Sequence, residues 1–456
     1  MVRLKKVSYC YEGSEKPSLC ACSLNVSKGE FVLLCGKSGC GKTTLTKLLN
    51  GIIPSQTEGM LSGHVYIDKQ DITEQPIWKT SLSVGSVFQN PKTQFFNLDT
   101  TSELVFGIEN MGLPQEQMAS RLEHVLMEYR LESLVNKSVF ELSGGEKQKI
   151  AIASAYMGNP DVYVLDEPSA NLDQEEIHRL KTLLRQLKRA GKTVIIAEHR
   201  VWYLAELLDR AVYMENGKIV REWTNKQFSA LGTKERANYG LRSIQPVTLL
   251  TAENGEPDNS GLRINNVQIK RNQKLLWKDL SFYAPKGKAI AIVGRNGAGK
   301  TTLAQVLCGL RSCKHGNIYL NGKPMTAKAL RQNSFLIMQD VNHQLFAESV
   351  LSEAKLGNDV AGEAAMSVLA QMQLDSFAEM HPMALSGGQK QRLAVVDGCL
   401  CQKSILIFDE PTSGLDLDNM ERVSHMIQGL AAQGKIVIVI THDIEFINHL
   451  GAEIIS

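Results

Sequence analysis

Directly after the apolar residues 31–35, the chain carries the stretch Gly36-Lys37-Ser38-Gly39-Cys40-Gly41-Lys42-Thr43-Thr44. This stretch fits the pattern G-x-x-x-x-G-K-[ST], which is the spacing of a loop that cradles phosphates. The glycines let successive backbone N–H groups turn toward a polyphosphate, Lys42 supplies a mobile positive charge, and the Thr43 hydroxyl can ligate Mg²⁺. A helical pattern at residues 45–49 follows, so the sequence predicts a strand, a phosphate-binding loop and a helix.

The same pattern returns at residues 294–302, GRNGAGKTT, between the apolar run 289–293 and the helical pattern 303–307. One match is compatible with an ordinary glycine-rich turn, but two matches in the same context favour two phosphate sites. The residues that we expect around the phosphates are Gly36, Ser38, Gly39, Gly41, Lys42, Thr43 and Thr44, and Gly294, Asn296, Gly297, Gly299, Lys300, Thr301 and Thr302.

Length and composition limit the class of protein. A chain of 456 residues is too long for one ordinary domain and predicts two or three. The 50 basic and 48 acidic residues nearly balance, which argues against a nucleic-acid binder. The nine cysteines include no zinc-binding pattern, and we expect reduced thiols. No apolar run approaches the ~18 residues that span a bilayer, so any membrane role is expected to come through a partner.

An internal repeat organises the chain. Lys300 minus Lys42 gives an offset of 258, whereas three later pairs of matching residues give 243, so the first half is 15 residues longer between the phosphate loop and Ser143. Those three pairs are Ser143 and Ser386, Asp166 and Asp409, and His199 and His442. The sequence therefore predicts two related domains, at residues 1–223 and 262–456, joined by a polar, turn-rich linker at residues 224–261.

Within each half, short apolar strands alternate with helical patterns, which predicts an α/β class with a mainly parallel sheet. The continuous apolar runs 161–165, 193–197, 404–408 and 436–441 are typical of parallel strands that are covered on both faces. In such sheets the ligand lies beyond the carboxyl ends of the strands.

Carboxylate pairs follow two of these strands, Asp166-Glu167 and Asp409-Glu410. Asp166 and Asp409 are placed to hold the Mg²⁺ shell, and each following glutamate is placed to orient or deprotonate an attacking water. The alternative is a strand end with solvated acids. Two adjacent acids at a buried strand end cost desolvation unless a cation offsets it, so the phosphate-loop context favours the catalytic interpretation.

The repeated stretches Leu142-Ser143-Gly144-Gly145-Glu146 and Leu385-Ser386-Gly387-Gly388-Gln389 fit S-x-x-E and S-x-x-Q capping boxes. We expect helices to begin near Lys147 and Lys390. A helix N-terminus with exposed glycine N–H groups and a serine hydroxyl is also an anion site. Capping does not need two consecutive glycines, which weaken a helix start, so they indicate a close approach to the backbone.

The motif order resembles that of the ATP-binding cassette (ABC) ATPases, over nearly the whole chain outside the linker. The motifs are, in order, the phosphate loop, a Gln after a short strand, LSGG, the D-E-P strand end, S-A-N-L-D or S-G-L-D, and a strand that ends in His. The resemblance implies two tandem P-loop NTPase domains, each with an antiparallel β part and a helical subdomain. It also implies ATP and Mg²⁺ as cofactors, ATP hydrolysis, and two composite sites in which LSGG of one half covers the phosphates bound by the other.

The resemblance also implies roles for individual residues. Gln89 and Gln339 resemble glutamines that sense Mg²⁺ and water, and His199 and His442 resemble histidines that contact the γ-phosphate. Asp173 and Asp416 resemble aspartates that communicate between halves, and Tyr11 resembles the aromatic that stacks on adenine. The residues that resemble the phosphate cover are Ser143, Gly144 and Gly145, and Ser386, Gly387 and Gly388. The implied metal ligands are Thr43, Gln89, Asp166, Thr301, Gln339 and Asp409. Tyr9 is a rival for Tyr11, and the second half offers only Arg271 for stacking.

Two departures from the family pattern stand out. The first histidine lies in Ala197-Glu198-His199-Arg200, and the second in the commoner Thr441-His442-Asp443. The second half also has no counterpart of the predicted hairpin at residues 214–220. Neither departure removes a catalytic group, so we expect two competent sites.

The stretches after the glutamines, QNPKTQFF from residue 89 and QDVNHQLF from residue 339, resemble those of energy-coupling-factor importer ATPases. Aromatic side chains give a large contact area, which suits Phe95, Phe96 and Phe346 to gripping a short helix of a partner. The alternative is that these side chains fill the core.

This resemblance implies a transmembrane energy-coupling subunit, a membrane substrate-binding subunit for a vitamin or metal ion, and a position at the cytoplasmic face of the cell membrane. Nucleic acid is not an expected partner. The alternatives are a tandem sugar-importer ATPase and a ribosome-acting tandem cassette protein, the latter disfavoured by the short, little-charged linker. A non-hydrolysing scaffold is disfavoured by Glu167 and Glu410.

Overall fold

The chain folds into two compact units, Met1–Pro246 and Val247–Ser456, in a computed structural model that describes residues 2–14, 16–170, 172–250, 260–271, 274–358 and 360–455. Each unit is mixed α/β with a parallel sheet at its centre, as the sequence predicts. None of the helices in these ranges is long and apolar enough to cross a bilayer. The division between the units falls inside the predicted linker.

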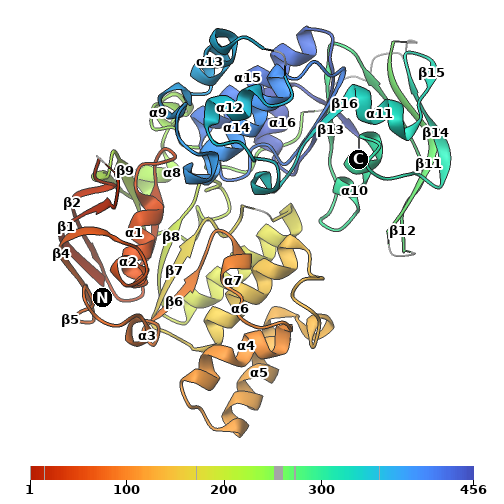
Figure 1. Ribbon diagram of the computed structural model, residues 1–456. Coiled ribbons are helices and arrows are strands. Elements are labelled where there is room, and N and C mark those ends of the chain that lie inside the picture. Colours follow the sequence, from red (N-terminus) through yellow and green to blue (C-terminus); the bar gives the residue numbers. More distant parts are fainter. Residues whose placement is uncertain are drawn as a thin grey trace. The chain divides into compact units, whose positions relative to one another are not determined.

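The central sheet of the first unit has six strands in the order β10-β9-β3-β8-β7-β6, of which Figure 1 labels β9, β8, β7 and β6. These are β3 (Phe31–Cys35), β6 (Val84–Val87), β7 (Val162–Asp166), β8 (Thr193–Ala197), β9 (Arg210–Glu215) and β10 (Lys218–Thr224). All neighbours are parallel except β9 and β10, which form a hairpin. Every residue of β3, β7 and β8 is buried, which explains their unbroken apolar sequences.

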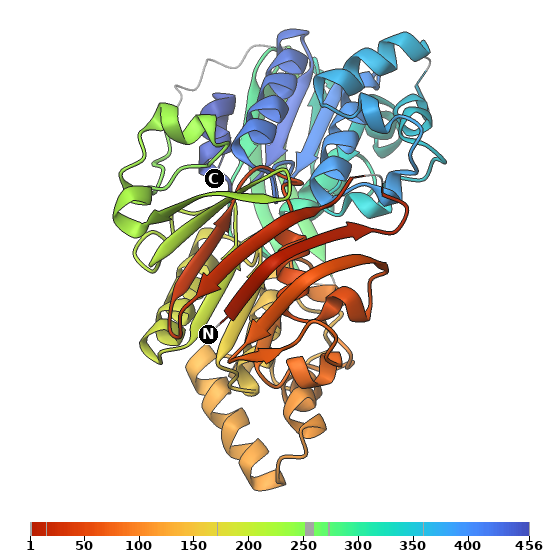
Figure 2. The same cartoon turned by 90° about the vertical axis from the view of Figure 1, so that its left-hand side faces the viewer.

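A second, antiparallel sheet has the order β2-β1-β4-β5, and Figure 2 shows its strands from the front. It contains β1 (Val2–Tyr11), β2 (Leu19–Val26), β4 (Gly59–Ile67) and β5 (Gln70–Asp71). Alternating inward side chains such as Val2, Leu4 and Leu24 share a core with Leu45 of α1 and Ile195 of β8. The helix after the phosphate loop is therefore packed between the two sheets.

The helices of the first unit are α1 (Lys42–Leu49), α2 (Ile52–Ser55), α3 (Ile77–Thr80), α4 (Thr100–Asn110), α5 (Gln115–Tyr129), α6 (Gly144–Met157), α7 (Gln174–Arg189), α8 (Asn225–Ser229) and α9 (Thr233–Asn238). Leu104, Ile150 and Leu180 of α4, α6 and α7 share a core with Phe31 and Leu33 of β3. Figure 1 shows α4 and α5 projecting next to α6 as a helical subdomain.

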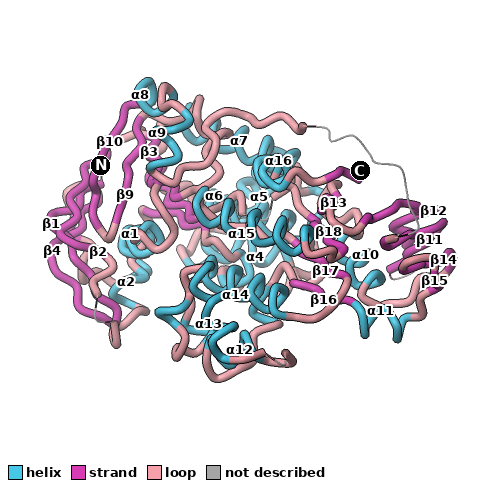
Figure 3. The backbone as a smooth tube through the Cα atoms, turned by 90° about the horizontal axis from the view of Figure 1, so that it is seen from above, coloured by secondary structure: helices cyan, strands magenta, loops and turns pink. Residues whose placement is uncertain are grey.

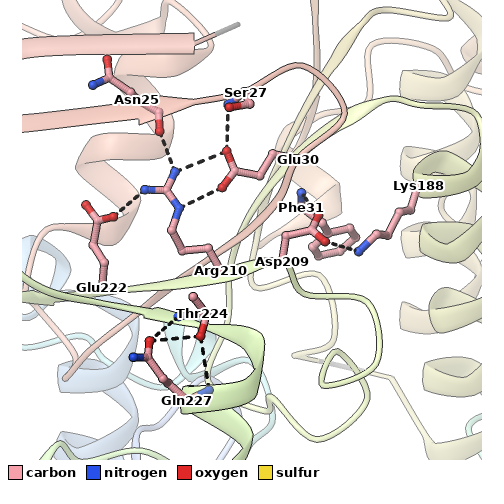
Figure 4. Close-up of polar contacts among 10 residues, drawn as sticks. All are labelled: Asn25, Ser27, Glu30, Phe31, Lys188, Asp209, Arg210, Glu222, Thr224 and Gln227. Carbon is pink, nitrogen blue, oxygen red and sulfur yellow. Dashed lines mark hydrogen bonds and ion pairs between the residues drawn. The ribbon is translucent and has the colours of Figure 1, made fainter.

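Arg210 joins three segments at the end of the central sheet away from the phosphate loop (Figure 4). Its Nε and Nη2 atoms donate to the two carboxylate oxygens of Glu30 at 2.8 and 3.4 Å, and Nη2 donates to the Asn25 carbonyl at 2.6 Å. Nη1 donates to Glu222. This fork fastens the turn between β2 and β3 to the β9–β10 hairpin.

The second unit repeats this architecture (Figure 3). Its parallel sheet has the order β16-β17-β18-β13-β19, and its antiparallel sheet the order β12-β11-β14-β15. The strands are β11 (Gly261–Arg271), β12 (Lys274–Pro285), β13 (Ala289–Ile292), β14 (His315–Leu320), β15 (Lys323–Pro324), β16 (Ser334–Ile337), β17 (Ile405–Asp409), β18 (Ile436–Ile440) and β19 (Glu453–Ile455). The helices are α10 (Lys300–Leu307), α11 (Ala327–Asn333), α12 (Val350–Lys355), α13 (Gly362–Gln371), α14 (Gly387–Leu400), α15 (Leu417–Ala432) and α16 (Ile444–Leu450).

Two differences between the units contribute to the changing offset of the repeat. Helix α5 has 15 residues and its counterpart α13 has 10, and α2 adds a turn to the first unit. Strand β19 pairs with β13 as β9 pairs with β3. Strand β19 is the last element of the described part of the second unit.

Residues 225–246, which the sequence places in the linker, pack as part of the first unit. Phe228, Leu241 and Ile244 are buried in the same core as β3 and α7, and the Tyr239 ring lies 5.1 Å from the Trp223 ring. The apolar residues are too widely spaced among polar ones to show a periodicity, which is why the pattern indicates a linker. The functional domain boundaries at residues 223 and 262 stay a prediction, and residues 251–259 lie outside the described part.

Candidate active sites

The first phosphate loop is the turn between β3 and α1. Gly36 and Gly41 have φ angles of 144° and 106°, and a Cβ atom at Gly36 would lie 2.2 Å from the Met214 carbonyl oxygen. Only glycine fits there. Lys42 is buried, and its ammonium donates to the carbonyl oxygens of Gly36 at 2.9 Å and Lys37 at 3.2 Å. The remaining predicted residues of the loop and the first turn of α1 are Ser38, Gly39, Thr43 and Thr44.

The second loop, between β13 and α10, repeats this geometry. Lys300 donates to the carbonyl oxygens of Gly294 at 2.6 Å and Arg295 at 3.0 Å, and its Nζ atom lies 2.8 Å from Nε2 of His442. That Nε2 atom also lies 3.0 Å from Oδ1 of Asn296. The remaining predicted residues are Gly297 and Gly299, which have φ angles of 77° and 93°, and Thr301 and Thr302 of α10.

Each site pairs a hydroxyl with a buried carboxylate. Thr43 Oγ1 lies 3.3 Å from Oδ1 of Asp166, and Thr301 Oγ1 lies 2.7 Å from Oδ2 of Asp409. Burial raises the pKa of both aspartates, so a cation beside them would offset an unfavourable charge. Hydroxyl and carboxylate oxygens are the hard ligands that Mg²⁺ prefers, together with water and phosphate oxygens. The residues therefore fit the ion that the sequence predicts.

Glu167 lies at the centre of the first site. Gln89 Nε2 donates to its Oε2 atom at 2.8 Å, and His199 Nε2 lies 3.5 Å from its Oε1 atom. Burial and the adjacent charge of Asp166 raise the pKa of Glu167 well above its usual range. Burial also lowers the pKa of His199, so its ring is uncharged at neutral pH. The sequence-predicted glutamine, glutamate and histidine are thus brought together.

Glu410 occupies the matching place in the second unit. Its Oε2 atom accepts a hydrogen bond from the Thr441 hydroxyl at 2.9 Å, and its Oε1 atom lies 3.7 Å from His442 Nε2. Gln391 of α14 donates to its carbonyl oxygen at 3.3 Å. Gln339 follows β16 as Gln89 follows β6. The first cassette has no counterpart of the Thr441 hydroxyl, because Glu198 stands at the equivalent position of the repeat.

Both glutamates have left-handed backbones, with φ of 44° at Glu167 and 52° at Glu410. Non-glycine residues seldom adopt this conformation, and it is held here because each N–H donates at 2.8 Å to the neighbouring strand, at Ala197 and Ile440 respectively. The carboxylates are thus fixed in direction at the carboxyl ends of β7 and β17.

A family comparison matches this arrangement to a known group of proteins. The family model for the ABC transporter matches residues 19–170 and 277–413, which include both phosphate loops and both D-E-P strand ends. The chain belongs to the ABC transporter ATP-binding proteins. It is accordingly an ATPase with two tandem ABC cassettes that bind ATP, and the predicted fold class is confirmed.

Relatives cover the full length of this ABC ATPase. A Treponema denticola protein named "Putative ABC transporter ATP-binding protein" is 48% identical, over 100% of this chain and 95% of its own length. The Bacillus subtilis "Putative HMP/thiamine import ATP-binding protein YkoD" is 31% identical, over 98% of this chain and 88% of its own length. A solved structure titled "Model of ribosome-bound archaeal Pelota and ABCE1" has a TM-score of 0.70 and 21% identity, over 96% of this chain and 74% of its own, and it shows the fold alone.

The LSGG stretches of this ABC ATPase form capping boxes in both cassettes, as predicted. The helices begin at Gly144 and Gly387, not near Lys147 and Lys390, because the serine itself is the N-cap residue and the glycines occupy the first turn. A Cβ atom at Gly145 would lie 1.9 Å from the carboxylate of Glu176 in α7, so only glycine fits there with Glu176 in this position, and the close approach of an anion to these glycines stays a prediction. The remaining predicted residues here are Ser143, Ser386 and Gly388.

Tyr9 and Tyr11 differ in their surroundings. Tyr9 is fully buried, and its hydroxyl donates to the carbonyl oxygens of Thr57 and Glu58. The Tyr11 ring is partly exposed, and its hydroxyl lies 3.2 Å from that of Thr44 in α1. Tyr11 is therefore the better placed to meet a nucleotide, and its adenine contact stays a prediction. The side chain of Arg271 lies outside the described residues.

The loops after Gln89 and Gln339 present one exposed phenylalanine each. The side chains of Phe96 and Phe346 are 76% and 74% exposed. Phe95 is instead partly buried against the core of the first cassette, which favours the alternative that its side chain fills the core, and its role in gripping a partner stays a prediction. Its counterpart Leu345 is likewise buried.

Buried acids fix the position of these two loops, and sequence reasoning missed them. Glu103 of α4 accepts hydrogen bonds from the backbone N–H groups of Phe96 at 2.9 Å and Asn97 at 2.8 Å. Glu353 of α12 accepts from those of Phe346 and Ala347, both at 2.7 Å. The sequence did carry a signal for these acids, because in each half a glutamate follows the exposed phenylalanine by seven residues.

Two further polar residues near the first site were also missed. Glu198 is buried beside His199, and the sequence showed it only as a departure from the family pattern. Arg242 is 3% exposed, and its charge contributes to the lowered pKa of His199. Arg242 was overlooked because it lies in the segment interpreted as a linker. Asp173 and Asp416, predicted to communicate between halves, are the N-cap residues of α7 and α15.

Proposed function

We propose that the chain is the ATP-hydrolysing subunit of an energy-coupling-factor importer at the cytoplasmic face of the cell membrane. It would power uptake of a vitamin or metal ion through a transmembrane energy-coupling subunit and a membrane substrate-binding subunit. The observation that carries the proposal is the pair of exposed phenylalanines, Phe96 and Phe346, each on a loop that begins at a glutamine of the active site. The B. subtilis relative, named for HMP/thiamine import, supports the class of cargo.

The chemistry proposed for each site follows from its contacts. Lys42 and Lys300 release their loop carbonyl oxygens to bind the β- and γ-phosphates, and Glu167 and Glu410 accept a proton from the attacking water. A pKa raised by burial makes Glu167 a stronger base than an exposed glutamate. When Mg²⁺ is bound, it neutralises phosphate charge; its proposed ligands are Thr43, Gln89 and Asp166, and Thr301, Gln339 and Asp409.

The loops give a physical route from this chemistry to a partner. Gln89 touches Glu167, and the chain from Gln89 to Phe96 is short. Gln94 braces this loop, because its side chain accepts from Phe88 N–H at 3.2 Å and donates to the Ser86 carbonyl oxygen at 3.1 Å. A change at the glutamate can therefore reach the exposed phenylalanine without passing through a flexible segment.

The test is to replace both exposed phenylalanines and look for loss of the partner. In the variant Phe96→Ala/Phe346→Ala, capture of membrane subunits from detergent-solubilised membranes should fall at least about tenfold, because aromatic side chains dominate such contacts. ATP hydrolysis by the isolated chain should stay within about twofold, because neither ring touches the site. Both quantities are measured on the same preparations.

Trp78→Ala provides a matched control, since this aromatic on α3 is also 61% exposed. It should leave capture unchanged. Capture that survives the double phenylalanine change, or a chain that co-purifies with ribosomes rather than membrane proteins, would contradict the importer proposal.

A further inference from the structure

The loops that carry the two active-site histidines have different sequences but make the same two hydrogen bonds. In the second cassette, the carboxylate of Asp443 accepts a hydrogen bond from the Thr412 hydroxyl at 2.9 Å. The Asp443 N–H in turn donates to the Thr441 hydroxyl oxygen at 3.1 Å. The second bond closes a ring around His442, and the first ties the loop to the segment after Glu410.

In the first cassette, a single side chain makes both bonds. The Oε1 atom of Glu198 accepts from the Ser169 hydroxyl and from the Arg200 N–H, the latter at 3.2 Å. Ser169 and Thr412 are 243 positions apart, as are Glu198 and Thr441, so the partners are equivalent in the repeat. The acid has moved from the residue after the histidine to the residue before it, and the connections are kept.

Glu198 is a costly residue to place here. It is 3% exposed, and its Oε2 atom has no hydrogen-bond partner among the described residues. Burial raises its pKa to about 7 in spite of the bonds from Ser169 and Arg200. An uncharged side chain would fill the same volume at lower cost, so packing alone does not account for an acid at this position.

The difference between Glu198 and its counterpart Thr441 also alters the surroundings of the catalytic glutamate. The Thr441 hydroxyl donates to Glu410 Oε2 in the second site. Glu198 stands in the equivalent place, and its negative charge adds to the raised pKa of Glu167 instead. The two sites thus hold their glutamates through different neighbours.

We propose that Glu198 is a positioning residue for His199, holding the histidine loop to the segment after Glu167 through its Oε1 atom. The proposal rests on the roles proposed above for His199 and Glu167. It predicts that the first site needs a hydrogen-bond acceptor at position 198. Glu198 alone meets this requirement, and so would the pair of residues that the second cassette uses, Thr441 and Asp443.

The experiment measures hydrolysis by the first site in the full-length chain that also carries Glu410→Gln, which silences the second. Glu198→Ala should lower kcat about tenfold while the KM for ATP changes less than about twofold, because a misplaced catalytic group affects chemistry more than binding. Glu198→Gln keeps the Oε1 acceptor and should retain at least about half of kcat. Glu198→Thr/Arg200→Asp recreates the second cassette's loop and should do the same.

Controls separate the possible failures. Glu206→Ala removes a surface carboxylate after β8 that pairs with Lys181 and Arg185, and it should leave kcat unchanged. If His199→Ala lowers kcat but Glu198→Ala does not, the positioning proposal is overturned and the role of His199 stands. If His199→Ala itself has no effect, the proposed role of the histidine fails. Equal losses in Glu198→Ala, Glu198→Gln and the double variant would also overturn the positioning proposal.

Discussion

At the scale of single residues, the strain and burial in each cassette gather at the ends of β7 and β17. The left-handed backbones of Glu167 and Glu410 and the buried aspartates beside them lie there, and His199, whose pKa is lowered by burial, lies next to Glu167. Such concentrations of unfavourable terms are typical of catalytic sites, because the rest of the fold supplies the stability that maintains them.

The buried carboxylate of Glu198 makes the free energy of unfolding depend on pH. Its pKa is about 7 when folded against an ordinary 4.5, so the folded chain keeps a proton that the unfolded chain loses as pH rises between these values. The free energy of unfolding therefore falls by about 3 kcal/mol from this group across that interval and is constant above it. Glu198→Gln does not titrate, so its melting temperature should exceed that of the unsubstituted chain by more at pH 8 than at pH 5.

Thermal unfolding of both proteins at several pH values between 5 and 8 checks this expectation. Comparing the two proteins cancels the titration of groups that Glu198 does not influence. A gap in melting temperature that stays constant across the series would show that Glu198 keeps an ordinary pKa.

At the scale of elements, each cassette depends on side chains that lock strands and helices at their ends. Capping boxes begin α6, α7 and α14, and buried Glu103 and Glu353 hold the loops before α4 and α12. These contacts satisfy backbone groups that the elements themselves leave open. They leave the phosphate loops and the glutamates on rigid supports.

Arg210 is the clearest case for measurement, because its fork holds β9, β10 and the turn before β3. Arg210→Ala should lower the free energy of unfolding by about 2–3 kcal/mol, since Glu30 is then left partly buried without its partner. The free energy of unfolding of Arg210→Lys should lie between those of the unsubstituted chain and Arg210→Ala, because an ammonium cannot make the planar fork. The midpoint of urea unfolding reports both changes.

The matched control is Arg179→Ala, which breaks an exposed pair with Glu175 within α7. Such surface pairs contribute at most about 0.5 kcal/mol. A loss as small for Arg210 as for Arg179 would mean that the network in Figure 4 does not fasten the hairpin.

At the scale of the whole molecule, the repeat places two complete sets of the predicted catalytic residues in one chain. Lysine, aspartate, glutamate, glutamine, serine and histidine are present at matching positions of both cassettes. We predict that each LSGG stretch serves the phosphate loop of the other cassette, which makes hydrolysis a property of the pair.

Single-site backgrounds test this pairing. With Glu410→Gln the remaining hydrolysis comes from the site of Lys42, and Ser386→Ala should lower it about tenfold while Ser143→Ala lowers it much less. With Glu167→Gln the pattern should reverse. Both serines cap a helix, so each controls for the loss of a cap. An effect confined to the serine of the same cassette would refute the cross-pairing.

The sequence by itself determined the duplicated α/β fold, the loops between strand and helix that carry the phosphate-binding pattern, the acids at the strand ends and the capping boxes. These depend on short-range spacing, which the chain displays directly. Only the tertiary structure decided that Phe95 packs inward while Phe96 is exposed, that residues 225–246 complete the first unit, and that Glu198 does the work of two residues. Each of these depends on which side chains meet although they lie far apart in the sequence. Tertiary packing determines those contacts, and the local sequence pattern does not.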